Sequence, residues 1–211
     1  MNWILIGIIL TAFFLLGSAR LAGAIRLAAV QGALLAAIPW LEGEMSNWHR
    51  IPLAIVIFVI KAIAIPVLLH RSIREAAVRQ EAEPGVSLHV SLLTGGLILV
   101  IAFSSARVLP LPATILSPLT IPVAFATFLI GFLILITRTQ AVSQIIGFLV
   151  LENGIFLFGS TLLTDFPLTV ELGVLLDLLV GVFVMGIMIY HIHRTFDHIN
   201  TKALSTLKDT E

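Results

Sequence analysis

Long apolar stretches separated by short polar segments dominate this chain. Stretches of about twenty residues are long enough to cross a bilayer as helices. They predict seven such helices, over residues 2–18, 24–41, 51–69, 87–106, 115–136, 141–162 and 168–190. The stretches are continuously apolar and do not alternate, which favours helices over a β-barrel. The pattern therefore predicts an all-α membrane protein with about seven transmembrane helices in one bundle.

The basic residues predict the orientation of this bundle. With seven spans, nine Lys and Arg residues fall on one side of the membrane, and Arg50 and Arg107 fall on the other. Cytoplasmic segments carry the excess of basic residues, so we expect the N-terminus outside and the C-terminus in the cytoplasm. The nine residues are Arg20, Arg26, Arg71, Arg74, Arg79, Arg138, Arg194, Lys202 and Lys208.

Composition narrows the possible functions. The chain is 59% hydrophobic and 11% charged, against about 25% charged in a typical soluble domain. Its formal net charge is zero, so no basic surface indicates binding to nucleic acid. The absence of cysteine excludes disulfides and cysteine-ligated metal centres. No histidine falls at the centre of a predicted span, which argues against a haem. We therefore expect no cofactor and no metal site in this chain.

Ionisable residues inside the predicted spans carry the strongest functional signal. Lys61, Glu152 and Asp177 lie near the centres of their spans, and Glu171 lies about a turn and a half before Asp177. A charge at the bilayer centre costs roughly 2.5–3.5 kcal/mol on insertion scales. A proton or cation path would explain several such residues in one chain. Two alternatives stay open: Glu152 and Asp177 as interhelical hydrogen-bonding groups, and Glu171 as a solvated surface residue.

Helical spacing indicates where these side chains point. Gly173, Asp177 and Gly181 share one face of their helix, and small residues allow a second helix to approach closely. We therefore expect Asp177 to point toward protein and not toward lipid. Lys61 and Glu152 lie at a similar depth, so the three charges would form a row if their helices adjoin.

The last third of the chain contains IIGFLVLENGIFLFG, then ELGVLLDLLVGVFVMGIMIYHIHRT, then the polar ending HINTKALSTLKD. These segments resemble subunit K of respiratory complex I and its relatives in multisubunit cation/proton antiporters. The whole chain resembles the component E family of hydrogenase-4, a membrane subunit of group 4 nickel–iron hydrogenase complexes of the formate hydrogenlyase type. The resemblance implies a five-helix membrane part over residues 1–140, a two-helix part similar to subunit K over 141–192, and a polar cytoplasmic tail over 193–211.

The resemblance also implies a role inside a larger complex. The chain would be a non-catalytic subunit in a bacterial or archaeal cytoplasmic membrane. Its partners would be antiporter-like and quinone-module-like membrane subunits, together with cytoplasmic nickel–iron hydrogenase subunits. The alternatives are a subunit of a multisubunit cation/proton antiporter and a purely structural membrane scaffold.

Subunit K carries one acidic residue in each of two neighbouring helices. Asp177 matches the second of these positions, whereas the first would align near Leu149, about one turn before Glu152. We expect Glu152, Asp177, Lys61 and Glu171 to line a proton or cation path. The family pattern assigns no role to Lys61, so its place on that path rests on its predicted depth alone.

Overall fold

The computed structural model describes residues 1–41, 47–75, 86–106, 117–162, 173, 176–177 and 179–186. Within these ranges the regular elements are helices. They are α1 (Asn2–Gly17), α2 (Leu21–Ala36), α3 (Ile38–Leu41), α4 (Asn47–Ile57), the π-helix η1 (Phe58–Ala64), α5 (Ile65–Glu75), α6 (Leu88–Ala106), α7 (Thr120–Thr137) and α8 (Ala141–Leu162). The described residues between 173 and 186 are also helical and are called the C-terminal helical segment.

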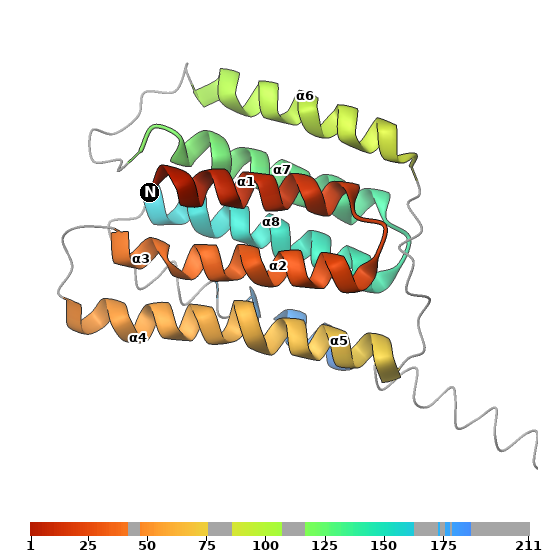
Figure 1. The fold of residues 1–211 in the computed structure, drawn as a ribbon, viewed down its shortest axis with the longest axis horizontal. Coiled ribbons are helices and arrows are strands. Elements are labelled where there is room, and N and C mark those ends of the chain that lie inside the picture. Colours follow the sequence, from red (N-terminus) through yellow and green to blue (C-terminus); the bar gives the residue numbers. More distant parts are fainter. Residues whose placement is uncertain are drawn as a thin grey trace, which may run out of the picture.

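The long helices lie side by side with nearly parallel axes (Figure 1). One edge of the bundle is α6, which packs on α7 and α1, and the opposite edge is the continuous rod formed by α4, η1 and α5. Between these edges lie α1, α2, α7 and α8. The predicted all-α class is confirmed.

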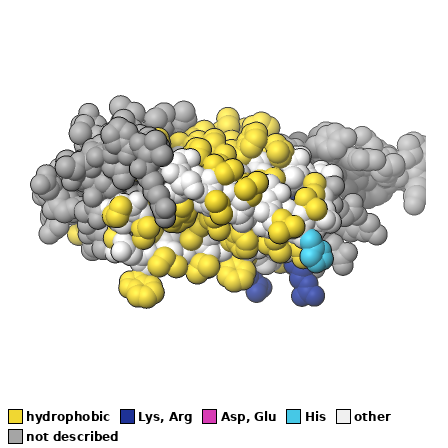
Figure 2. Space-filling model, turned by 90° about the horizontal axis from the view of Figure 1, so that it is seen from above, with side chains coloured by type: hydrophobic (Ala, Val, Ile, Leu, Met, Phe, Trp, Pro, Cys, Tyr) yellow, Lys and Arg dark blue, Asp and Glu magenta, His cyan; other side chains and the backbone are white. Residues whose placement is uncertain are grey.

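Four described helices are long and apolar enough to cross a membrane: Ala54–Arg74, Leu88–Ser105, Thr120–Thr137 and Ala141–Ser160. The helices Asn2–Gly17 and Leu21–Ala36 are apolar but shorter. Large apolar side chains are exposed on the outside of the bundle, including Leu93 at 75% and Val182 at 65%. Figure 2 shows hydrophobic side chains spread over one face, with Lys, Arg and His side chains toward one end. Such apolar exposure matches a lipid environment, and the chain is a multi-pass membrane protein.

The predicted spans overlap the described helices, with three local differences. The helix predicted over residues 51–69 is longer in the structure, where α4, η1 and α5 together cover residues 47–75. The single helix predicted over residues 24–41 is wrong, because α2 ends at Ala36 and α3 begins at Ile38. Pro39 has no N–H to donate and therefore interrupts the helical hydrogen-bond ladder there. The fifth predicted helix begins later than expected, at Thr120. Ser117 lies before this helix. Its hydroxyl donates a hydrogen bond to Asn2 Oδ1 on α1 and accepts one from the Leu119 N–H. The seventh predicted span lies only partly within the described residues.

Glycine residues bring α7 and α8 into backbone contact. A Cβ on Gly131 would collide with the backbone at Leu151, and one on Gly154 would lie 2.7 Å from the Phe128 Cα atom. Small residues at such an interface allow two membrane helices to pack closely along their length. This tight α7–α8 hairpin fixes the position of α8, which carries Glu152.

A buried arginine joins this hairpin to the α1–α2 hairpin. The connections within both hairpins lie at the same end of the bundle (Figure 1). Arg138, in the α7–α8 connection, donates hydrogen bonds to the carbonyl oxygens of Leu16 at 2.8 Å and Ser18 at 3.3 Å. The last carbonyl groups of a helix have no partner within the helix, so Arg138 satisfies the end of α1.

Candidate functional site

Three of the four predicted site residues meet inside the bundle. The Lys61 ammonium donates hydrogen bonds to Glu152 Oε1 and, at 3.2 Å, to Asp177 Oδ1. The side chains come from η1, α8 and the C-terminal helical segment, which lie far apart in the sequence. All three are buried, with 6%, 1% and 4% of their surface exposed. We call Lys61, Glu152 and Asp177 the ion cluster. Glu171, the fourth predicted residue, lies outside the described residues.

Lys61 lies in the π-helix η1, which interrupts an otherwise α-helical rod. At the end of η1 the Ile65 N–H donates to the Ile60 carbonyl, the five-residue spacing of a π-helix. Val59 and Ile63, on either side of Lys61, are 45% and 48% exposed, whereas Lys61 is buried. The lysine therefore points into the bundle, while its neighbours face outward. Single π turns inside α-helices are frequent at functional sites.

Gly32 on α2 lies directly against Lys61. A Cβ on Gly32 would be 2.7 Å from the Lys61 Cβ and 2.9 Å from its carbonyl carbon and oxygen. Only hydrogen fits at this position, so the α2 backbone packs onto η1. The contact fixes the lysine stem from one side, while the two carboxylates hold the ammonium from the other.

The C-terminal helical segment approaches α8 at Gly173, one of the two glycines at which the sequence predicted a close approach of another helix. A Cβ there would be 3.4 Å from the Phe156 ring and 3.9 Å from Glu152 Oε1. Gly181 has no described atom within 4 Å, so the predicted close approach is found at Gly173 only. Asp177 points toward protein and not toward lipid, as its 4% exposure shows.

A second polar network adjoins the ion cluster. The Gln31 side chain on α2 donates from Nε2 to the carbonyl oxygen of Ile8 on α1, at 3.1 Å. Asn153 on α8 donates from Nδ2 to Gln31 Oε1 at 3.0 Å. Both amides are buried, with 0% and 3% of their surface exposed. The network thus links α8 through α2 to α1, beside the residue that ion-pairs with Lys61.

The cluster contains two acids and one base. With all three groups ionised its net charge is −1, and one added proton makes it neutral. Separated charges in a low-dielectric interior are costly, and direct pairing offsets part of that cost. A buried group of this composition can therefore hold or release a single proton or cation without leaving a large unpaired charge.

Comparison with known proteins places this chain in a family. No family model matches it, and no solved structure matches it. The uncharacterized protein Rv0085 of Mycobacterium tuberculosis is 38% identical over 210 residues, covering 96% of this chain and 93% of that protein. The chain belongs to the Rv0085 family.

The Rv0085-family chain also has more distant relatives. Hydrogenase-4 component E of Escherichia coli K12 is 29% identical over 153 residues, covering 72% of this chain and 70% of that protein. The component E protein of Shigella flexneri shows the same identity and coverage. The similarity agrees with the resemblance noted from the sequence, at the level of a distant relation.

Two parts of the site in this Rv0085-family protein were not predicted from the sequence. Gln31 is the one uncharged polar residue in LAAVQGALLAAIPW. A single polar side chain in an apolar helix could have indicated a buried hydrogen-bonding site. The π-helix has no comparable signal in the sequence and is recognised from the burial pattern of the structure. Buried residues recur at Ile57, Lys61, Ile65 and Leu69, three successive steps of four. In an ideal α-helix, residues spaced four apart would rotate by about 120° around the helix axis over these three steps. The wider turn of a π-helix brings them back to one face.

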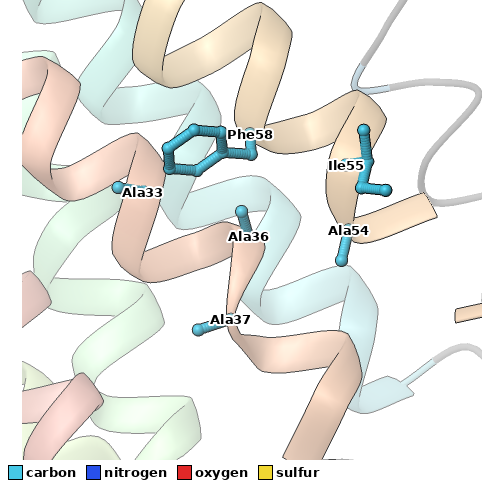
Figure 3. Close-up of a pocket in the computed structure, with 6 residues that line it drawn as sticks. All are labelled: Ala33, Ala36, Ala37, Ala54, Ile55 and Phe58. Atoms are coloured by element: carbon cyan, nitrogen blue, oxygen red, sulfur yellow. The ribbon is translucent and has the colours of Figure 1, made fainter. Parts of the chain in front are cut away.

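An apolar groove of about 400 Å³ lies beside the start of η1. Figure 3 shows that it is formed between α2 and the α4–η1 rod. The described residues that line it carry no charged or polar side chain, so they offer no side-chain ligand for an ion, unlike the ion cluster. Its lining residues are Ala33, Ala36, Ala37, Ala54, Ile55 and Phe58.

Proposed function

We propose that this chain is a membrane-arm subunit of a hydrogenase-4-like respiratory complex. In this role Glu152 and Asp177 accept and release protons or cations on a translocation path, and Lys61 modulates them electrostatically. The chain itself is non-catalytic, and partner subunits carry out the redox chemistry. The observation that carries the proposal is the contact of Lys61 with both carboxylates inside the bundle.

The composition of the ion cluster supports a conducting role over a structural one. A structural hydrogen bond between membrane helices needs only a donor and an acceptor side chain, and no ionised group. Here two carboxylates share a single ammonium, which leaves one negative charge to be neutralised. Buried ionisable residues in membrane helices are typical of proton relays and ion pathways. A redox event that alters the field at the cluster would therefore change how tightly it holds a proton.

The position of the basic residues supports the proposed orientation. Arg20 and Arg138 lie in the two connections found at one end of the bundle, and Arg74 lies in the last turn of α5. This end would face the cytoplasm, since basic residues are enriched on that side. A seven-helix topology then has the N-terminus outside and the tail over residues 193–211 in the cytoplasm of a bacterium or archaeon.

The proposed partners follow from the relation to hydrogenase-4 component E. They are antiporter-like and quinone-module-like membrane subunits and cytoplasmic nickel–iron hydrogenase subunits. The chain would lie between the redox arm and the antiporter-like subunits. Its two proposed parts, residues 1–140 and 141–192, would both be needed, because Lys61 comes from the first part and the acids from the second.

Copurification tests this assignment. The chain would be tagged at its own locus, extracted in mild detergent and analysed by mass spectrometry. We expect nickel–iron hydrogenase subunits to copurify with it. Recovery with cation/proton antiporter subunits alone would support the antiporter alternative and contradict the hydrogenase assignment.

Proton uptake by membrane vesicles tests the conducting role. We expect Glu152→Gln to abolish turnover-driven proton movement while the complex still assembles. Ser160→Ala is the matched control on the same helix, because Ser160 donates only to the Leu157 carbonyl of its own helix, at 2.9 Å. Unchanged proton movement in Glu152→Gln would support the scaffold alternative instead.

A further inference from the structure

The amide orientations in the second polar network are fixed by its contacts. A main-chain carbonyl can only accept a hydrogen bond, so Gln31 must direct Nε2 toward Ile8 and Oε1 toward Asn153. Asn153 must then donate from Nδ2 to Gln31. Its remaining oxygen, Oδ1, is buried and accepts no hydrogen bond from the described residues.

The preceding residue on α8 has the same feature. Glu152 Oε1 accepts the hydrogen bond from Lys61, whereas Oε2 is buried and accepts none from the described part of the chain. An unsatisfied buried acceptor is costly, because it has given up its hydrogen bonds to water. Among the described residues, these two oxygens on consecutive positions are therefore available to a hydrogen-bond donor or a cation.

Glu152 and Asn153 form hydrogen bonds with two neighbouring elements of the bundle. Glu152 reaches Lys61 in η1, and Asn153 reaches Gln31 in α2. Gln31 is followed by Gly32, where an added Cβ would lie only 2.7 Å from the Lys61 Cβ, so the α2 backbone directly contacts Lys61. The contacts therefore close a ring that runs from Lys61 through α2 to Asn153 and back through Glu152.

We propose that Glu152 Oε2 and Asn153 Oδ1 bind a buried water molecule, through which Glu152 exchanges its proton, and that the conducted ion is a proton and not sodium. The inference rests on the proposed function and assigns its ion and its point of exchange. A water molecule can donate one hydrogen bond to each of the two oxygens. In uptake, the water molecule passes one proton to Oε2 as it accepts another from the path, which leaves water and a neutral carboxylic acid; release reverses this step.

Electrostatics favours the proton over a metal cation. Lys61 already occupies one oxygen of each carboxylate, so a sodium ion would lie beside an ammonium and be repelled by it. A proton on Oε2 adds no second cation. It turns the net charge of the cluster from −1 to zero, and the new O–H group can donate to the proposed water molecule. Gln31 would act as a positioning residue, because it holds Asn153 in the orientation that leaves Oδ1 available.

The test uses the purified complex in liposomes, with a pH-sensitive dye inside and, in parallel samples, radioactive sodium outside. We expect turnover-driven proton movement without sodium uptake. Asn153→Leu should lower proton movement at least tenfold while hydrogenase turnover continues. Thr127→Val is the matched control, because the buried Thr127 hydroxyl donates to the Val123 carbonyl of its own helix at 2.7 Å.

An infrared measurement separates a positioning role from a structural one. The C=O stretching band of the protonated Glu152 side chain is identified by its loss in Glu152→Gln. This band should shift in Gln31→Leu and in Asn153→Ser, which retains an acceptor oxygen. It should stay unchanged in Thr127→Val. If Asn153→Leu fails to assemble, Asn153→Ser and the sodium measurement decide the question.

The outcomes for the two proposals are distinct. Sodium uptake driven by turnover would overturn the assignment of the ion. Wild-type proton movement and an unshifted band in the Asn153 and Gln31 variants, with loss of movement in Glu152→Gln, would overturn the water site and leave the proposed function standing. Full proton movement in Glu152→Gln would contradict the proposed function itself.

Discussion

Gly32 and Lys61 lie so close together that only a hydrogen atom fits between α2 and the π-helix. A Cβ on Gly32 would be 2.7 Å from the Lys61 Cβ and 2.9 Å from the Lys61 carbonyl oxygen. This contact connects the helix that carries Gln31 to the helix that carries the lysine of the ion cluster. The position of the ammonium therefore depends on a residue that has no side chain.

Gly32→Val should destabilise the protein. The added side chain would meet backbone atoms of Lys61, which cannot move without displacing η1, and such overpacking costs about 1–3 kcal/mol. Gly96→Ala is the control, because no described atom lies within 4 Å of a Cβ there. Gly96→Ala should leave the free energy of unfolding unchanged or raise it by about 0.5–1 kcal/mol, since glycine is unfavourable within a helix. Thermal unfolding in detergent measures both effects, and equal transition temperatures for the two variants would contradict the close contact.

Lys61→Met should be more damaging than the loss of a surface charge. It leaves Glu152 and Asp177 buried beside each other without a cation, and removing one partner of a buried ion pair costs about 3–5 kcal/mol. Adding Glu152→Gln and Asp177→Asn to Lys61→Met removes the unpaired charges and should restore most of the lost stability. A double-mutant analysis of unfolding measures this coupling. Strictly additive effects of the substitutions would show that the three groups do not interact.

Gly154→Leu should separate the α7–α8 hairpin. A Cβ at Gly154 would lie 2.9 Å from the Ala124 carbonyl oxygen as well as against the Phe128 backbone, so the side chain has no space. Gly181→Leu is the matched control, since no described atom lies within 4 Å of its Cβ position. The Gly154 variant should accumulate less folded protein in the membrane, measured by fluorescence-detected gel filtration. Similar elution and yield for both variants would contradict the tight hairpin.

Much of the fold was predictable because each membrane span leaves a strong local signal. The helix limits of α6 and α8 agree closely with the predicted residues 87–106 and 141–162. The break at Ala37 and the later start of α7 were not predicted, because they depend on proline geometry and on a side chain from α1. Depth along each span also predicted that Lys61, Glu152 and Asp177 lie at a similar level.

Contacts between spans were harder to predict from one sequence. Nothing local to Lys61 and Asp177 shows that they meet, since they are 116 residues apart and the helices between them could be arranged in several ways. Gln31 has the same difficulty, because its partners Ile8 and Asn153 lie on two other helices. Such residues acquire a role only through packing, and packing in membranes is set by shape and small residues more than by hydropathy.

The double variant Glu152→Gln with Asp177→Asn tests the central claim most directly. The quantity to measure is the number of protons moved for each pair of electrons transferred, in vesicles that contain the assembled complex. We predict that the variant continues redox turnover while this ratio falls to near zero. The wild-type ratio in an assembled variant would contradict the claim that the ion cluster carries protons.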